Sequence, residues 1–376
     1  MTLSNLHSRG SQALPTRPRV FVNGKFLAQR TTGVQRVASA LISAIDADPE
    51  MPADRFVVLS PRGAPSPQWD RVEVQRVGPV GLPLHVWEQC LLPMAARGGL
   101  LLNLAGSAPW FSGRCAAVLH DAAVWDTPES YSLAFRWWYR ALFHHLARTA
   151  DRLFTVSEYS QRRLSEVLKL APGRCTVLRN GSDHLDKVVA RPAVLSRLGL
   201  MGRPFLLTVG SFSPAKNLAM LAKAYALARL GPDVPLVLVG GESAMVFATT
   251  SRFEEPIGWT LAGSVDDGEL RALYQGAVAL LVPSRHEGFC LPAAEALREG
   301  CAVLASRSTA LPELFGGEVA TLPADDAGAW AAAMRRLVVD DIWRRSLLEH
   351  GRRHLGDVRW ALRARQLVAS VVSGES

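Results

Sequence analysis

Cysteine and long apolar runs are scarce in this sequence of 376 residues. The cysteines are odd in number, widely scattered and without a C-x-x-C pair; they are Cys90, Cys115, Cys175, Cys290 and Cys301. This distribution argues against a disulfide framework or a zinc site and fits a reducing cytoplasm. No apolar run approaches the ~18 residues that a membrane-spanning helix needs. The sequence therefore predicts a globular protein whose fold depends on apolar cores.

Lysine is also scarce and supplies only five of the 42 basic side chains. The sequence has 34 acidic side chains, so its net charge is +8. Residues 1–190 hold 22 basic and 15 acidic side chains, whereas residues 191–376 hold 20 and 19. The basic surplus of the first half could face nucleic acid, anionic lipid or a phosphorylated substrate. The sequence has no Lys/Arg run, helix-turn-helix cue or RNA-stacking aromatic signature, so we expect no nucleic-acid partner.

Short apolar runs alternate with segments of helical period along the whole chain. We expect strands near residues 19–23, 55–60, 72–77, 100–103, 115–119, 152–156, 204–210, 235–240, 259–262, 278–283 and 301–305. We expect helices near residues 34–46, 84–96, 131–149, 158–169, 217–230, 267–276, 291–299, 325–338, 341–353 and 358–372. Buried-type strands that alternate with helices predict an α/β protein with parallel sheets covered by helices on both faces.

The alternation restarts after a polar stretch that is rich in glycine and proline, which predicts two doubly wound domains. The expected parts are a flexible leader, 1–18; an N-terminal Rossmann-like domain, 19–185; a linker, 186–203; a C-terminal Rossmann-like domain, 204–355; and a C-terminal helix, 356–376, that packs back on the N-terminal domain. A mitochondrial transit peptide is the alternative interpretation of the leader. Two such domains in tandem place a ligand cleft between the carboxyl ends of two sheets.

The most informative segment is 278–313, where a strand is followed by R-H-E-G-F-C-L-P-A-A-E-A-L-R-E-G. Glu287 follows the strand, and Glu295 lies one turn into the next helix. Gly288 and Phe289 offer backbone N–H groups near the start of that helix, where an anion can bind. A carboxylate at this place can accept hydrogen bonds from the two hydroxyls of a ribose. The alternative is that both glutamates are solvated acids that stabilise the helix start through its dipole.

This segment resembles the E-x7-E signature of the retaining glycosyltransferases of family 4, which have the GT-B fold of two Rossmann-like domains that face each other across a cleft. Further segments agree in order over residues 19–365. They are N-G-K-F-L-A-Q-R-T-T-G-V-Q-R at 23–36, V-L-H-D at 118–121, T-V-S-E-Y-S at 155–160, V-L-R-N-G-S-D at 177–183, T-V-G-S-F-S-P-A-K-N-L at 208–218 and A-G-S-V-D-D-G-E-L-R-A-L-Y at 262–274. The resemblance implies an acceptor-side N-terminal domain and a C-terminal domain that binds a nucleotide sugar.

The resemblance also implies roles for single residues on the donor side. Lys216 would pair with the donor diphosphate, and its alternative is a surface lysine at a helix start. Glu295 would bind the nucleotide ribose, and Glu287 would lie beside the donor sugar. Gly288 and Phe289 would donate backbone N–H bonds to the sugar or the phosphate.

Two further donor contacts follow from the resemblance. Gly33 opens the helix 34–46, and its N–H would meet the diphosphate from the N-terminal domain; a plain turn glycine is the alternative. Family members often carry an arginine at the position of Ser211 or of Ala215, and neither is basic here. Arg285 and Arg36 are the candidates for this second basic contact to the diphosphate.

His120 would lie against the donor sugar, where its backbone or ring stabilises positive charge at the anomeric carbon. The sequence shows no pair of carboxylates that would flank the bond as in glycosidases. The resemblance instead implies a front-face displacement, in which the leaving phosphate takes the proton of the acceptor hydroxyl. The sequence has no D-x-D metal signature with supporting ligands, so we expect neither metal nor cofactor. His120 and Glu287 are the expected catalytic residues.

The helix expected at 131–149 places Arg136, Arg140 and His144 on one stripe, with Trp137 and Trp138 on neighbouring faces. Basic and aromatic residues on one helix suit an anionic membrane surface or a lipid-linked acceptor. The alternative is a core helix with a solvated basic face.

The donor and the acceptor are not readable from the motifs. Relatives with a G-V-Q-R loop often act in bacterial polysaccharide assembly, which favours mannose from GDP-mannose, with glucose from a UDP donor second. We expect a glycan or a lipid-linked saccharide as acceptor, and a cytoplasmic protein with peripheral contact to the inner face of the plasma membrane. The alternatives from other classes are a GT-B nucleotide-sugar epimerase, a glycogen-type phosphorylase and a non-catalytic sugar-nucleotide binding protein.

Overall fold

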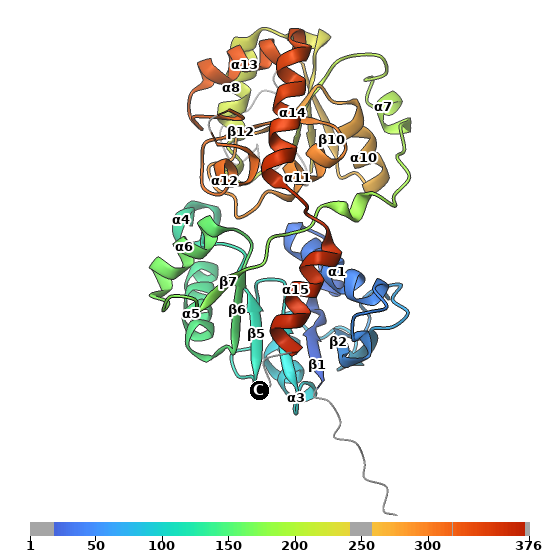
Figure 1. The fold of residues 1–376 in the computed structure, drawn as a ribbon, viewed down its shortest axis with the longest axis vertical. Helices are drawn as coiled ribbons and strands as arrows, with labels where there is room; N and C mark the ends of the chain where they lie inside the picture. Colours follow the sequence, from blue (N-terminus) through green and yellow to red (C-terminus); the bar gives the residue numbers. More distant parts are fainter. Residues whose placement is uncertain (1–18, 241–257, 318, 373–376) are drawn as a thin grey trace, which may run out of the picture.

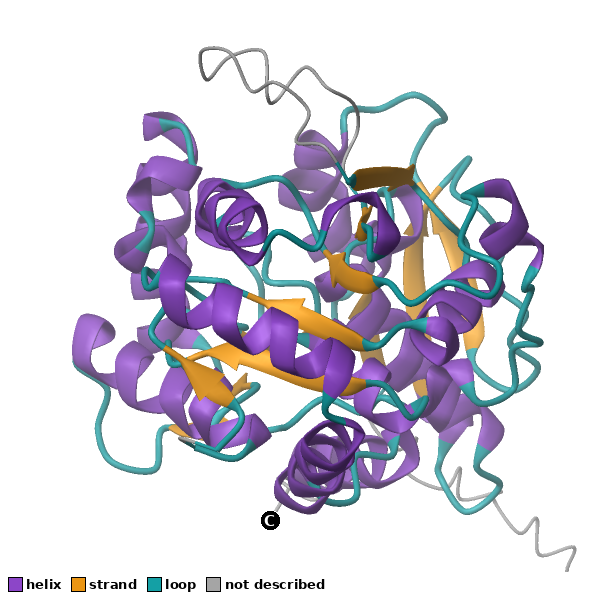
Figure 2. Cartoon of the chain, turned by 90° about the horizontal axis from the view of Figure 1, so that it is seen from above, coloured by secondary structure: helices purple, strands orange, loops and turns teal. Residues whose placement is uncertain are grey.

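The computed structural model describes residues 19–240, 258–317 and 319–372. They form an N-terminal and a C-terminal α/β unit, which lie one below the other in Figure 1. Each unit is a parallel sheet with helices on both faces (Figure 2). The fold class predicted from the alternation of strands and helices is confirmed. The leader expected at 1–18 and the last four residues of the helix expected at 356–376 lie outside the described residues.

The sheet of the N-terminal unit has the strand order β3-β2-β1-β4-β5-β6-β7, and all neighbours are parallel. Its strands are β1 (Val20–Asn23), β2 (Phe56–Pro61), β3 (Glu73–Val77), β4 (Leu100–Asn103), β5 (Cys115–Val118), β6 (Arg152–Thr155) and β7 (Cys175–Val177). The chain order reverses between β1 and β4. The loops that follow these two strands diverge, which leaves a crevice at their carboxyl ends.

The sheet of the C-terminal unit has the order β10-β9-β8-β11-β12-β13, again with parallel neighbours. Its strands are β8 (Leu206–Val209), β9 (Leu236–Val239), β10 (Trp259–Gly263), β11 (Ala279–Val282), β12 (Ala302–Ser306) and β13 (Thr321–Leu322). All four residues of β9 and of β11 are buried and apolar, as expected for central strands covered on both faces. The order reverses between β8 and β11, which places a second crevice there.

Helices cover both sheets. Those of the N-terminal unit are α1 (Gly33–Ala47), α2 (Leu84–Val86), α3 (Leu92–Ala95), α4 (Ala123–Asp126), α5 (Leu133–Thr149) and α6 (Glu158–Leu168). Those that follow are α7 (Ala193–Arg197), α8 (Leu218–Ala228), α10 (Asp267–Gly276), α11 (Leu291–Arg298), α12 (Leu311–Phe315), α13 (Ala327–Val339), α14 (Asp341–Leu355) and α15 (Trp360–Val372). No described helix combines the length and the apolar character that crossing a bilayer requires.

The predicted elements agree with the structure within one or two residues at most ends, and the differences concern short elements. The strands β7 and β13 and the helices α4, α7 and α12 were not predicted, because so few residues carry no readable period. Of these, α7 lies inside the linker expected at 186–203. The helix expected at 84–96 is divided by a π-helical turn at Trp87–Leu91, just before Pro93, which has no N–H to continue the ladder.

The chain crosses twice between the two units. The first crossing leaves the N-terminal unit near Ser182, and the second joins α14 to α15, which packs against α1 of the N-terminal unit (Figure 1). Arg365 of α15 forms ion pairs with Asp48 and Glu50, both at 2.8 Å. The two crossings also bond to each other, because the N–H of Ser182 donates to the carbonyl of Val358 at 2.7 Å.

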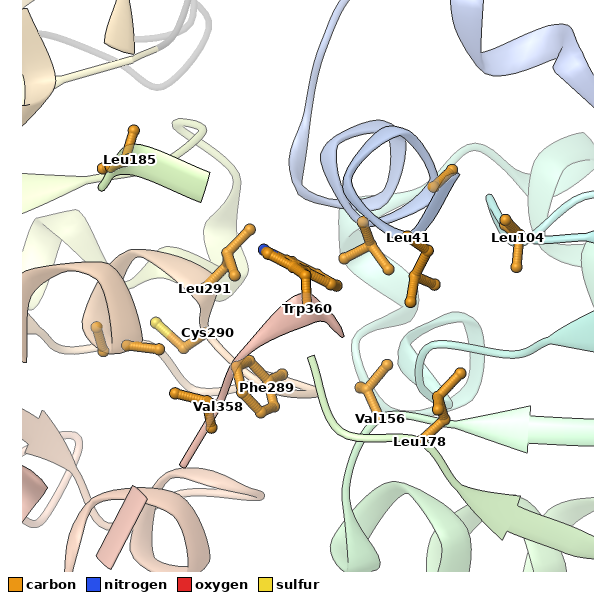
Figure 3. Packing of buried hydrophobic residues seen from close by; sticks show 14 of the residues in the cluster. Leu41, Leu104, Val156, Leu178, Leu185, Phe289, Cys290, Leu291, Val358 and Trp360 are labelled. Carbon is orange, nitrogen blue, oxygen red and sulfur yellow. The ribbon is translucent and has the colours of Figure 1, made fainter. Parts of the chain in front are cut away.

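An apolar core continues through this junction. Trp360, at the start of α15, is only 4% exposed. Figure 3 shows its ring between Leu291 of the C-terminal unit and Leu41 of the N-terminal unit, in one buried cluster with Phe289 and Val358. The two units therefore share a core along the edge where the chain crosses.

The opposite edge is held by a polar contact between the units. Glu313 of α12 accepts hydrogen bonds from the backbone N–H groups of Glu158 at 2.9 Å and of Tyr159 at 2.7 Å, the first residues of α6. A carboxylate at a helix N-terminus is stabilised by the helix dipole. An acid of the C-terminal unit thus caps a helix of the N-terminal unit.

Candidate active site

The candidate residues lie in loops that follow strands, at the facing edges of the two sheets. In the C-terminal unit, Lys216 follows β8 and Glu287 follows β11, the two strands between which the order reverses. In the N-terminal unit, Gly33 opens the helix after β1, and His120 follows β5. The carboxyl ends of parallel strands are the edge at which α/β proteins bind ligands. The fold therefore brings residues from distant segments to this interface.

The loop after β8 is built to hold Lys216 in place. A Cβ on Gly210 would lie 3.3 Å from Cε of Lys216, so the missing side chain leaves room for the lysine at the strand end. Asn217 adopts a left-handed backbone with a φ of 56°, which asparagine tolerates better than most residues. Its buried amide donates to the carbonyls of Pro283 at 3.2 Å and Ala324 at 2.8 Å, which ties the loop to the end of β11.

Lys216 and Glu287 form an ion pair. Nζ of Lys216 lies 2.6 Å from Oε1 of Glu287, which also accepts a hydrogen bond from the Ser284 hydroxyl at 2.7 Å. The Glu287 backbone is fixed by Thr309, whose hydroxyl accepts the Glu287 N–H at 2.9 Å. Burial opposes the charge of Lys216, but Glu287 and Asp121 outweigh it and raise the pKa of the ammonium. The site therefore keeps a cation at the end of β8.

Gly288 is a point of close approach between the two units. A Cβ there would lie 2.9 Å from the carbonyl oxygen of His120 and 3.1 Å from Cβ of Asp121. Phe289 is 3% exposed and packs into the shared core. The next helix starts only at Leu291, because Cys290 has a left-handed φ of 66°. The backbone between Glu287 and α11 is thus held against the opposite unit.

His120 is a neutral histidine at the end of β5. Its Nε2 lies 2.9 Å from the carbonyl oxygen of Leu104, so this nitrogen carries the proton and Nδ1 remains an acceptor. Burial is the main cause that lowers the pKa of the imidazole. Its carbonyl oxygen, which faces Gly288, accepts a hydrogen bond from the Thr155 hydroxyl at 3.3 Å. Both the ring and the carbonyl are therefore held at the interface.

His286 lies buried between two carboxylates of the N-terminal unit. Nε2 is 3.8 Å from Oδ2 of Asp121, Nδ1 is 3.9 Å from Oδ2 of Asp126, and neither ring nitrogen makes a hydrogen bond. Burial opposes protonation, but Asp121 and Asp126 outweigh it and raise the pKa of the imidazole. Burial would raise the pKa of Asp121, and the neighbouring His286 lowers it instead. His286, the residue before Glu287, thus links the two units through its electrostatic attraction to Asp121 and Asp126.

Glu295 lies on the buried side of α11 and is 3% exposed. The phenol of Tyr274 donates to its Oε2 at 2.8 Å, and Nε2 of His184 lies 3.0 Å from its Oε1. An ionised carboxylate has about four acceptor positions, so two remain for a ligand. The predicted contact of Glu295 with a ribose stays a prediction, and these positions are compatible with it.

Both arginines considered for the second diphosphate contact are paired with carboxylates. Arg36, on the first turn of α1, holds Asp267 of the C-terminal unit through two hydrogen bonds of 2.6 and 2.9 Å. Its charge also interacts with that of Glu295. Arg285 pairs with Asp325 at 2.6 Å on the exposed surface. Arg36 therefore bridges the two units on the Glu295 side of the site.

Gly33 is the first residue of α1. Thr32 and Gln35 form a capping box around the helix start. A Cβ on Gly33 would meet no atom within 4 Å, so the space beside the helix start is open. An open helix N-terminus can receive an anion, and the predicted contact with the diphosphate stays a prediction.

A groove of about 1500 Å³ runs along α1 on the side of the chain crossing. Arg36, Asp267, His184 and Trp360 are among its lining residues, whereas Lys216, Glu287 and His120 are not. A much smaller pocket at the end of β8 includes Lys216. This groove thus lies on the side of the chain crossings, and Lys216, Glu287 and His120 are not among its lining residues.

A buried polar network supports the loops of the N-terminal unit. Glu88, 1% exposed, lies 2.6 Å from Nζ of Lys25, and its Oε1 accepts from Asn23 at 2.9 Å and from Ser107 at 2.6 Å. Asn23 ends β1, and Ser107 lies in the loop after β4. Glu88 thus ties together the loops at the crevice of this sheet.

The helix expected at 131–149 is α5, and the arginines of the stripe predicted on it are partly buried. Nε and Nη2 of Arg140 donate to the carbonyl of Val124 at 2.9 and 2.7 Å, and the guanidinium lies 5.8 Å from the ring centroid of Trp125. Nε of Arg136 is buried. The face that carries these arginines is turned toward α4, because the free carbonyl at Val124 offers Arg140 two hydrogen bonds.

The exposed face of α5 is apolar. Trp137 is 72% and Leu133 is 67% exposed, and these two residues are one helical turn apart. Trp138 instead contacts the rings of His85 and Trp110, with centroids 4.7 and 5.9 Å away. Of the two tryptophans expected on neighbouring faces of this helix, Trp137 is thus exposed and Trp138 is half-buried.

Several site residues were not found from the sequence. His286 and Ser284 stand beside Glu287, Tyr274 ends the segment 262–274, and His184 follows the segment 177–183. Their position directly next to a motif is the only signal in the sequence. Histidine and tyrosine are too common in cores for this signal to assign them a role.

Residues 196–354 match the family model described as glycosyl transferases group 1. The chain is 27% identical to O-antigen chain mannosyltransferase B of Escherichia coli over 66% of this chain and 67% of that protein. It is 28% identical to the serotype-specific mannosyltransferase WbdA of Escherichia coli, over 68% of this chain and 33% of WbdA. It is 32% identical to the MMP alpha-(1->4)-mannosyltransferase of Mycolicibacterium hassiacum, over 67% of this chain and 64% of that protein. The match thus spans about two thirds of two relatives and a third of WbdA.

Solved structures resemble the whole described chain. Sucrose-phosphate synthase from Thermosynechococcus elongatus superposes with a TM-score of 0.71 at 20% identity and covers 96% of this chain and 100% of its own. Anabaena HepE in complex with UDP-glucose gives 0.68 at 17% identity, with 95% and 99% covered. The family match, the relatives and these structures together show that the chain is a group 1 glycosyltransferase of family 4 with the GT-B fold.

Proposed function

We propose that this enzyme transfers mannose from GDP-mannose to a glycan or lipid-linked saccharide, with retention at the anomeric carbon and without a metal ion. The observation that carries the proposal is the Lys216–Glu287 pair opposite His120, with a cation, an acid and a neutral imidazole at the facing edges of the two sheets. Mannose is favoured because three of the relatives are named mannosyltransferases. The presence of Glu287, Glu295 and Lys216 together weighs against a sugar-nucleotide binding protein without catalysis.

The proposed chemistry relies on positioning and charge. Lys216 neutralises charge that develops on the leaving diphosphate, and the backbone N–H groups of Gly288 and Phe289 hold its oxygens or those of the sugar. The acceptor hydroxyl attacks on the face from which the nucleotide leaves. Its proton passes to the departing phosphate oxygen, so the protein needs no separate base. The His120 carbonyl or the Nδ1 lone pair faces the anomeric carbon as positive charge builds.

The experiment is a transfer assay with GDP-mannose, UDP-glucose, ADP-glucose and a CMP sugar, each with and without excess EDTA. We expect transfer from GDP-mannose at an unchanged rate in EDTA, and a product with the anomeric configuration of the donor. The thermal shift with GDP, UDP, ADP and CMP should rank the bases in the same order, since binding to the folded state raises its stability. If transfer occurs from UDP-glucose instead, the proposed donor sugar is glucose and not mannose. Loss of turnover in EDTA that Mg²⁺ or Mn²⁺ restores would contradict the metal-free mechanism, and free epimerised sugar nucleotide would place the enzyme in another class.

We also propose that the protein is cytoplasmic and that the N-terminal unit contacts an anionic membrane through the exposed face of α5. Trp137 and Leu133 lie on this face, and Phe111, 78% exposed, follows Trp110, whose ring contacts Trp138. Exposed aromatic and aliphatic side chains beside a basic half of the chain are typical of an interfacial surface. The basic surplus of residues 1–190 supports the attraction to anionic lipid.

A double variant, Leu133→Gln with Trp137→Gln, should lower sedimentation with anionic vesicles by at least about tenfold, since burying each such side chain contributes about 1.5–3 kcal/mol. The matched control is Val339→Gln with Ile342→Gln, which changes exposed apolar residues 81% and 77% exposed in the C-terminal unit. The measurement compares both variants and the wild type on anionic and neutral vesicles at low and high salt. Equal sedimentation of the two variants would show that α5 is not the contact.

A further inference from the structure

The two chain crossings, which we call the hinge, are joined by several contacts. Besides the bond from Ser182 to Val358, the N–H of Trp360 donates to Oδ1 of Asp183 at 2.7 Å. A Cβ on Gly181 would lie 2.6 Å from the Trp360 ring, so glycine lets the crossings touch. His184 is the next residue along the first crossing, in the 3-10 turn η5 (Asp183–Leu185).

The contacts of His184 determine which ring nitrogen carries its proton. The indole N–H of Trp360 can only donate, and it lies 3.3 Å from Nδ1 of His184. Nδ1 is therefore the acceptor, and a neutral ring carries its hydrogen on Nε2. Nε2 is buried, makes no aligned hydrogen bond and lies 3.0 Å from Oε1 of Glu295. The one free donor of this histidine is thus beside the carboxylate expected to hold the ribose.

The segment after His184 is attached to the C-terminal unit. Asp186 forms a bidentate pair with Arg298 of α11 at 2.5 and 2.6 Å, and Arg271 of α10 donates to the carbonyl of Val188 at 2.5 Å. Trp360 instead begins α15, which packs on α1 of the N-terminal unit. His184 therefore contacts the Glu295 helix on one side and a residue anchored to the opposite unit on the other.

We propose that His184 is a positioning residue that donates from Nε2 to Glu295 when nucleotide is bound and orients its carboxylate toward the ribose hydroxyls. Tyr274 holds Oε2 and His184 holds Oε1, so each oxygen keeps one acceptor position for the ribose diol. The same bond links nucleotide binding to the hinge through Trp360. This inference rests on the proposed role of Glu295 in donor binding.

The test compares ligands with and without the ribose diol. GDP and UDP are titrated calorimetrically into wild type and His184→Ala, beside their 2′,3′-dideoxy analogues. We expect His184→Ala to weaken binding of the preferred nucleoside diphosphate about tenfold, as for a hydrogen bond to a charged group, and to leave the dideoxy analogue unchanged. His184→Gln, whose amide can donate near the position of Nε2, should restore most of the affinity. His354→Ala, an exposed histidine on α14, is the matched control.

Each result decides between the parts of the argument. If His184→Ala weakens the nucleoside diphosphate and its dideoxy analogue equally, the effect is structural and the proposal is overturned. If it weakens neither ligand, the proposal is overturned as well. If Glu295→Gln still distinguishes GDP or UDP from the dideoxy forms as well as the wild type does, the donor-binding role of Glu295 fails first. Should His184→Ala not fold, Trp360→Phe is the second variant. It keeps an aromatic ring at this position but removes the indole N–H that sets the tautomer of His184. If Trp360→Phe prefers the nucleoside diphosphate over its dideoxy analogue by the same factor as the wild type, the proposal is overturned too.

Discussion

Replacing Lys216 with alanine should lower kcat/KM for the donor by about 10- to 150-fold, the equivalent of about 1.5–3 kcal/mol for a hydrogen bond to a charged group. The loss should be of this size because Lys216 is the cation that the loop after β8 is built to present. Removing it also leaves the buried Glu287 carboxylate with only the Ser284 hydroxyl at Oε1. An unpaired buried charge repels a diphosphate, so nucleoside diphosphate binding should weaken as well.

Steady-state transfer and calorimetric titration with GDP and UDP measure the two parts of this effect. Lys223→Ala is the matched control, because Lys223 is exposed on α8, close to Lys216 in sequence, and is not a site residue. Both variants should unfold at similar temperatures if Lys216 serves binding rather than folding. A Lys216→Ala enzyme that binds nucleoside diphosphate as tightly as the wild type would remove this residue from the donor site.

Replacing Gly288 with alanine should reduce kcat by up to about 100-fold, because a displacement of about 1 Å at a reaction centre can cost that much. The added Cβ would lie 2.9 Å from the His120 carbonyl oxygen, closer than carbon and oxygen normally approach. The Cβ and the carbonyl oxygen are both attached directly to the main chain, so neither can yield by rotating a side chain. The two units would have to move apart, and the acceptor would meet a donor held too far from His120.

The measurement separates binding from turnover. Nucleoside diphosphate binding should change little, since the contacts of the C-terminal unit remain, whereas kcat falls. Gly113→Ala is the control, because Gly113 is exposed and its Cβ would meet no atom within 4 Å. An unchanged kcat in Gly288→Ala would mean that catalysis does not need the two units to approach as closely as they do in this structure.

The fold was largely predictable because its central strands are short, continuous apolar runs with turn residues on both sides. Glu287 and His120 could be placed just past strand ends for the same reason, whereas Lys216 and Gly33 were assigned from the resemblance. What could not be predicted is which of these loops touch. The Lys216–Glu287 pair joins segments 71 residues apart, and no local pattern encodes that contact.

The surroundings of the arginines on α5 could not be predicted for a related reason. The spacing of Arg136 and Arg140 predicts one stripe on a helix, but helical spacing does not tell whether that stripe faces water or protein. The Val124 carbonyl and the Trp125 ring, both from α4, decide it. Since α4 has only four residues, it was not predicted, and its partner on α5 could not be recognised either.

The two units share a core at Trp360, so any rotation of one unit against the other would turn about this edge. With the axis at this buried edge, points near it hardly move when the cleft opens, whereas points at the opposite edge travel far. Glu295 and His184 lie beside this edge, because His184 contacts both Glu295 and Trp360, whereas α12 and α6, which Glu313 joins, lie on the opposite side (Figure 1). A small opening of the two units would therefore break the contact of Glu313 with α6 first and would leave Glu295 and His184 almost undisturbed.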